Sequence, residues 1–156
     1  MPKHGKKILC LISKLNRYMD ENCTLTELLK VFMERNSIDL SVIHDQTIRK
    51  HFTKFRLGDH KLQIEVGRHH NIPLAERICT RCCLGAVEDE YHALLHCNDY
   101  AQMRDCYFPK VRIWSPHIDM LSSEDKFAWL MNNLDEYIIV LTAKFISYIM
   151  KSHITK

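Results

Sequence analysis

Apolar residues recur every three to four positions over most of this chain, which is the spacing of one face of an α-helix. The repeat is interrupted by short polar stretches and by glycine and proline, which are typical of helix ends. The pattern therefore predicts a mainly α-helical fold. The expected helices cover residues 6–19, 24–36, 46–66, 87–97, 98–107, a stretch that begins after Ser122, and 134–154.

Residues that favour helix ends predict the bounds of several of these helices. Ser41 and Asp45 are both suitable starts for the long helix that continues to residue 66, and Gly67 is expected to end it. Gly58 lies inside that helix and indicates a kink or a close contact there. Pro109 is expected to close the helix over 98–107.

The stretch from residue 79 to residue 97 contains the residue types of a metal site. A Cys-x-x-Cys pair, Cys79 and Cys82, is followed by a short acidic spacer and then by His92 and Cys97. A tight turn can point two sulfurs of such a pair at one tetrahedral ion. Three sulfurs and one imidazole suit Zn²⁺ and leave no coordination position open for catalysis. The sequence thus predicts a structural Cys₃His zinc site.

Two ligand choices stay open at this point. Cys83 directly follows Cys82 but lacks the two-residue gap of the pair. His96 competes with Cys97, because His92 and His96 are four residues apart and share a helix face. His92 and Cys97 are five apart, so they diverge on an ideal helix unless Cys97 lies at its frayed end. We prefer Cys97, since a third thiolate adds affinity for zinc.

Residues 47–70 form the most basic part of the chain, with six Lys or Arg, two acidic residues and therefore a balance of +4. Basic side chains gathered on one helix face can contact phosphate groups. The alternative is an ordinary solvated face with scattered ion pairs. The residues expected to contact nucleic acid are Arg49, Lys50, Lys54, Arg56, His60, Lys61 and Arg68.

Composition indicates where in the cell the protein is expected and whether it spans a membrane. The chain has 156 residues, a formal net charge of +3 and seven cysteines, and no hydrophobic leader is visible at its start. We therefore expect an intracellular protein with reduced thiols, in the nucleus or the cytoplasm. Lys144 interrupts the last apolar helix near its centre, which favours a core helix over a membrane span.

A series of motifs over residues 45–110 resembles a known family. In chain order these motifs are Phe52 to Arg68, Ile72-Pro73, Glu76-Arg77-Ile78-Cys79-x-x-Cys82, Val87 to Cys97, Tyr100 and Arg104. Together they resemble the zinc-binding tail that follows the polymerase in reverse transcriptases of non-long-terminal-repeat (LINE-like) retrotransposons. In that family the tail is thought to help hold template nucleic acid. The resemblance implies the same four zinc ligands and places Arg56, His60 and Arg68 on the basic segment before them.

The chain also departs from that family. The polymerase core carries a paired-aspartate motif that binds catalytic metal, and this sequence contains no Asp-Asp pair and no endonuclease segment. A zinc deaminase is excluded as well, because it requires a His-x-Glu box before its Cys-x-x-Cys pair. We therefore expect no enzyme, but a separate reading frame from a transposon remnant or a reused tail.

The sequence predicts three parts: divergent N-terminal helices over 1–44, the zinc-binding region over 45–110, and C-terminal helices over 111–156 that pack on it. The favoured function is a non-catalytic zinc module that binds RNA or DNA through the phosphate backbone, without a membrane. A reverse transcriptase core in trans is a further expected partner. The alternative is a zinc-stapled helical protein-interaction domain, or an inert remnant, that binds no nucleic acid.

Overall fold

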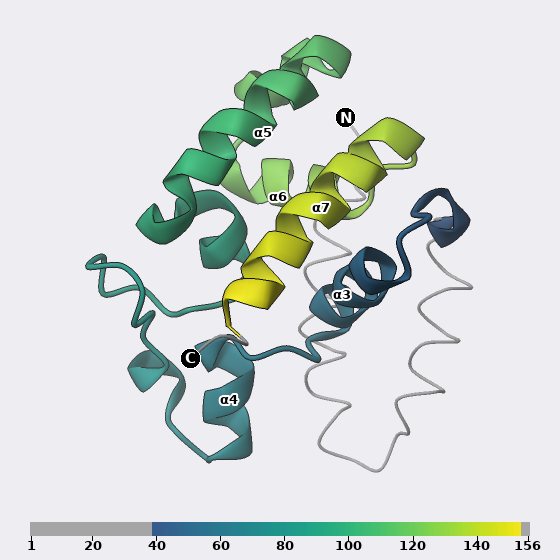
Figure 1. Ribbon diagram of the computed structural model, residues 1–156. Helices are drawn as coiled ribbons and strands as arrows, with labels where there is room; N and C mark the ends of the chain where they lie inside the picture. Colours follow the sequence, from purple (N-terminus) through teal and green to yellow (C-terminus); the bar gives the residue numbers. More distant parts are fainter. Residues whose placement is uncertain (1–38, 154–156) are drawn as a thin grey trace.

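The structure is a computed structural model that describes residues 39–153 (Figure 1). The helices expected over 6–19 and 24–36 lie outside the described residues. Between residues 39 and 153 the regular structure is helical, and extended pairing is limited to one antiparallel bridge between Ile78 and Val87. This confirms the mainly α-helical class, with the predicted zinc-binding turn inserted between helices.

The helices follow one another in a simple order along the chain. The longer ones are α3 (Gln46–Leu57), α5 (Ala101–Trp114) and α7 (Glu136–Ser152). The shorter ones are α4 (Gln63–His69) and α6 (Ser123–Met131). Short helical turns lie between them: η1 (Leu40–Val42), η2 (Leu74–Glu76), η3 (His92–His96), η4 (Asn98–Tyr100) and η5 (Pro116–Met120).

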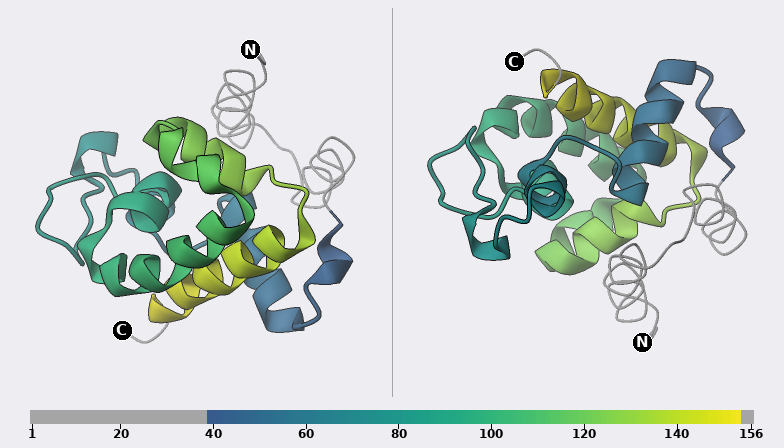
Figure 2. Two further views of the ribbon diagram at one scale, coloured as in Figure 1. Left: turned by 90° about the horizontal axis from the view of Figure 1, so that it is seen from above. Right: turned by 90° about the horizontal axis from the view of Figure 1, so that it is seen from below.

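Helix α7 is the centre of the packing, as the sequence predicts for its last helix. It contacts α3, α5 and α6, and Figures 1 and 2 show α3 and α5 on different sides of it. Nine of its 17 residues are buried, so more than one face is covered by neighbouring helices. Asp135 starts the helix by accepting a hydrogen bond from the backbone N–H of Ile138. No helix within the described part of the chain has the length and apolar character needed to cross a bilayer.

The single long helix expected over 46–66 is wrong, because the chain breaks after Leu57. Asp45 starts α3, as one of the two predicted caps, and its carboxylate accepts hydrogen bonds from the backbone N–H groups of Thr47 and Ile48. Gly58 then takes a left-handed conformation with φ of 71° and ends α3. The glycine that indicated a kink in the sequence is therefore the end of one helix, and α4 begins five residues later.

Gly67 does not end a helix, since it lies inside α4. A Cβ atom at this position would lie 2.5 Å from Cγ of Arg77. Arg77 crosses α4 here and donates hydrogen bonds to the carbonyl oxygens of Ile64 and Ile72, both at 2.9 Å. Glycine is required at residue 67 because the arginine side chain packs directly against the helix backbone.

The C-terminal half contains one confirmed and one incorrect prediction of a helix end. The Ser122 hydroxyl accepts a hydrogen bond from the backbone N–H of Asp125, so α6 begins where the sequence predicts. Pro109, by contrast, does not close α5, which continues to Trp114. An interior proline removes one backbone hydrogen bond. Tyr107 and Val111, two residues before and after Pro109, are both buried, which favours continuation of the helix.

Candidate metal centre

The predicted ligands Cys79 and Cys82 lie on a hairpin whose base is the bridge between Ile78 and Val87. The backbone N–H of Cys79 donates to the carbonyl of Ala86 at 2.9 Å, which closes the turn. Val87 therefore has an extended backbone, and the helix expected over 87–97 is too long at its start. Helical backbone begins at Glu90, and the turn η3 follows from His92.

The backbone of residues 92–97 explains how His92 and Cys97, five residues apart, can reach the same site. The turn η3 is a π-helix, and the backbone N–H of Cys97 donates to the carbonyl of His92, five residues earlier, at 2.7 Å. A π turn brings residues five apart toward the same side, whereas an α-helix separates them. The Asp89 carboxylate accepts a hydrogen bond from the backbone N–H of His92 at 2.7 Å and so stabilises the start of this turn.

The four donor atoms of Cys79, Cys82, His92 and Cys97 all lie within 4.8 Å of one another. The Sγ atoms of Cys79 and Cys97 are 3.8 Å apart, and Cys82 Sγ lies 3.3 Å from His92 Nε2. Two sulfurs bound to one tetrahedral zinc are expected about 3.8 Å apart, and a sulfur and an imidazole nitrogen about 3.5 Å apart. A disulfide would require about 2.0 Å. The cluster therefore has the donor atoms and dimensions to hold one metal ion.

Burial of this cluster favours a bound cation. The exposed fractions of Cys79, His92 and Cys97 are 3%, 4% and 0%. Burial raises the pKa of the Cys79 and Cys97 thiols, so both would stay protonated without a positive charge beside them. Burial also lowers the pKa of His92, which favours the neutral imidazole that binds metals. A divalent cation would supply the charge that two buried thiolates require.

The two alternative ligands lie outside the cluster. Cys83 is exposed, although its neighbour Cys82 belongs to the group. His96 is also exposed, and its ring packs against the ring of Tyr91 with centroids 4.8 Å apart. The preference for Cys97 over His96 therefore agrees with the geometry.

Two residues that the sequence did not single out for this site, Glu88 and Arg81, lie next to the candidate ligands. Glu88 is 2% exposed, its Oε1 lies 3.4 Å from Cys79 Sγ, and its Oε2 accepts a hydrogen bond from the backbone N–H of Gln63. Arg81, between Cys79 and Cys82, is held by several hydrogen bonds. In the sequence, Glu88 is one of three consecutive acidic residues, Glu88-Asp89-Glu90, and nothing there marks it as the buried one. The bridge at Val87, which follows from the fold, places Glu88 beside Cys79.

Arg104, which the motif series includes, also reaches the centre. Its Nη2 donates to the backbone carbonyl oxygen of Cys97 at 2.5 Å. A positive charge beside this ligand is favourable, because a Zn²⁺ ion with three thiolates and a neutral imidazole has a net charge of −1.

The seven basic residues expected to contact nucleic acid do not form one exposed face, because the helix that should carry them is broken at Gly58. Arg49 turns back and donates two hydrogen bonds, at 2.9 and 2.7 Å, to the carbonyl oxygen of Ile43. The guanidinium of Arg56 lies over the ring of Phe52, and burial lowers its pKa to about 10. Both arginines therefore contribute to packing inside the fold.

His60 and Arg68 also have partners within the described residues. The His60 side chain is fully buried, and its Nε2 lies 2.8 Å from Oε1 of Glu90. Arg68 forms an ion pair with the buried carboxylate of Glu65 at 2.5 Å. Glu90, from the segment of the metal site, and Glu65, from α4, are thus the partners of these two side chains.

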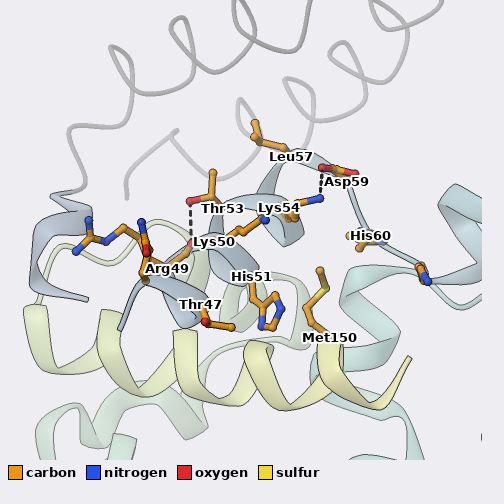
Figure 3. A pocket seen from close by; sticks show the side chains of 12 residues that line it. Thr47, Arg49, Lys50, His51, Thr53, Lys54, Leu57, Asp59, His60 and Met150 are labelled. Atoms are coloured by element: carbon orange, nitrogen blue, oxygen red, sulfur yellow. Dashed lines mark hydrogen bonds and ion pairs between the residues drawn. The ribbon is translucent and has the colours of Figure 1, made fainter. Parts of the chain in front are cut away.

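The remaining basic residues surround a cavity of about 990 Å³ beside α3. Figure 3 shows Lys50 and Lys54 on α3, with His51 directed toward α7 and Met150 projecting from α7. Lys61 also lines this cavity. Lys50 and Lys61 are exposed, whereas Lys54 forms an ion pair with Asp59 at 2.7 Å.

Comparisons of the chain with protein-family models, curated proteins and solved structures found no match. The resemblance to the reverse transcriptase tail therefore rests on the motifs of the sequence.

Proposed function

We propose that this chain is a non-catalytic helical module that binds one structural Zn²⁺ through Cys79, Cys82, His92 and Cys97. The observation that carries the proposal is the convergence of these four donor atoms within 4.8 Å, with the Cys79–Cys97 sulfurs 3.8 Å apart as in a tetrahedral site. Because all four positions are occupied by protein ligands, none is open to a water molecule or substrate. The ion would stabilise the fold and take no part in a reaction.

We also propose that the module derives from the zinc-binding tail of a LINE-like reverse transcriptase. The motif series supports this origin, and two of its members, Tyr100 and Arg104, each donate a hydrogen bond to the carbonyl oxygen of Cys97, Tyr100 from its backbone N–H. Tyr100 is buried with its hydroxyl 2.9 Å from Ser152 Oγ, and Arg104 bonds the Cys97 carbonyl. A reverse transcriptase core in trans is the partner that this origin predicts.

X-ray absorption at the zinc edge of the purified protein tests the metal proposal. The expected spectrum has three sulfur neighbours at about 2.3 Å and one nitrogen neighbour at about 2.0 Å. A shell dominated by oxygen neighbours would contradict the proposal. So would a protein that contains no zinc after purification and takes up none when zinc is added.

The cavity beside α3 favours a second function, in which the protein binds the phosphate backbone of RNA or DNA. The exposed Lys50 and Lys61, together with Lys54, place three lysines around one cavity. Such a site would bind phosphates with little sequence preference and with a steep dependence on salt. The protein-interaction alternative predicts no such binding.

The double variant Lys50→Ala/Lys61→Ala tests this second function, and Lys110→Ala/Lys144→Ala is its matched control. All four of these lysines are exposed, and each variant removes two positive charges. On duplex DNA the first variant should weaken binding to every sequence equally and reduce the salt slope by about two units. The control should leave the slope unchanged. Equal behaviour of both variants, or no binding by the wild type, would favour the protein-interaction function.

A further inference from the structure

The C-terminal end of α7 is held by the turn that carries two of the candidate zinc ligands. Arg81 lies between Cys79 and Cys82, and its side chain is only 10% exposed. Its Nη2 donates to the backbone carbonyl oxygen of Ser152, in the last turn of α7, and its Nη1 donates to Asp99 Oδ2 at 2.8 Å. Figure 1 shows this end of α7 beside the loop that carries the turn.

A second contact joins the same two parts of the molecule. The buried carboxylate of Glu88 lies 3.1 Å from Nε2 of His153, the residue that ends α7, and 3.4 Å from Sγ of Cys79. The same carboxylate binds the backbone N–H of Gln63, the first residue of α4. Glu88 thus connects a ligand, the start of α4 and the end of α7.

The contact of Arg81 with α7 is of a kind that stabilises a helix end. The last four carbonyl groups of an α-helix have no partner within the helix, and together they carry a partial negative charge. Arg81 provides both a donor and a positive charge at this point. Its position depends on the turn between residues 79 and 87. The backbone pairing of that turn lies at its base, in the bridge between Ile78 and Val87 and the hydrogen bond from the Cys79 N–H to the Ala86 carbonyl.

We propose that the metal ion clamps the end of α7: by fixing Cys79 and Cys82 it holds Arg81 on the last carbonyls and Glu88 beside His153. The metal centre then controls the order of the last turns of α7 as well as that of its own loop. Met150, in these turns, lines the cavity beside α3, and Ser147 Oγ lies 2.8 Å from Nδ1 of His51, which lines the same cavity. This inference rests on the proposed zinc site, and it assigns Arg81 and Glu88 a role that metal binding alone does not require.

Hydrogen exchange of the zinc-loaded protein, with and without a chelator, tests the clamp. Removing zinc should speed exchange in residues 147–153 while the first turns of α7 stay protected. Arg81→Ala should reproduce this effect in zinc-loaded protein, with exchange about tenfold faster, as expected for the loss of one charge-assisted hydrogen bond. Arg112→Ala is the matched control, because Arg112 forms an exposed ion pair with Asp119 at 2.6 Å and touches neither α7's end nor the metal ligands.

The possible outcomes separate the two proposals. A zinc-loaded wild type whose residues 147–153 are unaffected by the chelator, while 74–91 exchange freely, overturns the clamp but leaves the zinc site in place. A wild type that binds no zinc overturns the zinc site itself. A weaker zinc affinity in Arg81→Ala supports the clamp, because the coupling between metal and helix must act in both directions. Arg81→Lys keeps the charge and should lose less protection than Arg81→Ala.

Discussion

Helix α7 and the segment from residue 74 to residue 91 are held in place by different means. In α7 the buried side chains are mostly apolar, and Phe145, Ile146 and Ile149 are almost fully enclosed. In the 74–91 segment only Cys79 and Glu88 are buried, and neither is a large apolar residue. A helix of the first kind folds by removing apolar surface from water, whereas the second segment has too little such surface to do so.

The size of the two effects explains how both parts can be stable in one fold. Each fully buried large apolar side chain contributes about 1.5–3 kcal/mol. A structural zinc ion contributes about 10–16 kcal/mol in isolated zinc-finger peptides. One ion can therefore replace several missing core residues, and the stability of the 74–91 segment should depend on the metal while that of α7's first turns should not.

Metal removal should break the molecule along this division and produce the largest effect. A chelator should raise hydrogen exchange in residues 74–91 toward that of an unfolded chain, because the backbone pairing there is limited to the short turn η2 and a few hydrogen bonds around the bridge between Ile78 and Val87. Residues 92–100 should keep more protection, since Leu94 and Tyr100 are buried in the core. Equal protection of 74–91 with and without chelator would remove the distinction between the two regions.

Truncation in α7 should have the opposite selectivity. Ile146 is 0% exposed, so Ile146→Ala should lower the free energy of unfolding by about 2–5 kcal/mol without changing the zinc content. Urea denaturation and metal analysis of the same sample measure both quantities. Tyr148→Ala is the control in the same helix, because Tyr148 is 46% exposed and should change stability far less. If Ile146→Ala released the metal under native conditions, metal binding would depend on the apolar packing of α7 and not only on the contacts of its last turns.

Gly67→Ala should show a packing requirement just before the metal turn. The added Cβ would lie 2.5 Å from Cγ of Arg77, so we expect a loss of about 1–3 kcal/mol in the free energy of unfolding. Arg77→Ala removes the Cγ atom, and in that background the same substitution should cost much less. A double-mutant cycle by chemical denaturation gives the coupling between the two residues. Additive effects would mean that close packing is not the reason for the glycine.

Tyr107→Phe should give the smallest effect and should sharpen the description of the core around α7. The Tyr107 hydroxyl lies 2.7 Å from Thr142 Oγ1, and Thr142 itself donates to the carbonyl oxygen of Ile138. Phenylalanine would remove one buried hydrogen bond and leave Thr142 with a partner, so the expected loss is about 0.5–1.5 kcal/mol. Thermal denaturation of both proteins measures it. A loss above that of Ile146→Ala would show that polar contacts dominate this core.

The sequence predicted what depends on neighbours along the chain. Helical periodicity identified the central role of α7, and the caps at Asp45 and Ser122 are the observed helix starts. The spacing of the Cys-x-x-Cys pair, His92 and Cys97 identified the group of four that converges. Each of these features follows from residues within a few turns of one another.

The sequence did not predict features that depend on contacts between distant residues. The need for glycine at residue 67 comes from Arg77, and the burial of His60 comes with a partner, Glu90, that is 30 residues away. The periodic pattern across Gly58 extends one helix too far, because apolar spacing continues through a backbone that does not. The π turn at His92 also has no signal of its own in the sequence.

Native mass spectrometry of the wild type, Cys82→Ser and Cys83→Ser tests the central claim most directly. The two cysteines are adjacent, but only Cys82 belongs to the cluster, while Cys83 is exposed. One Zn²⁺ per chain is predicted for the wild type and for Cys83→Ser, and loss of the stable complex for Cys82→Ser. A Cys82→Ser protein that keeps its zinc as firmly as the wild type, or a wild type that binds none, would contradict the account.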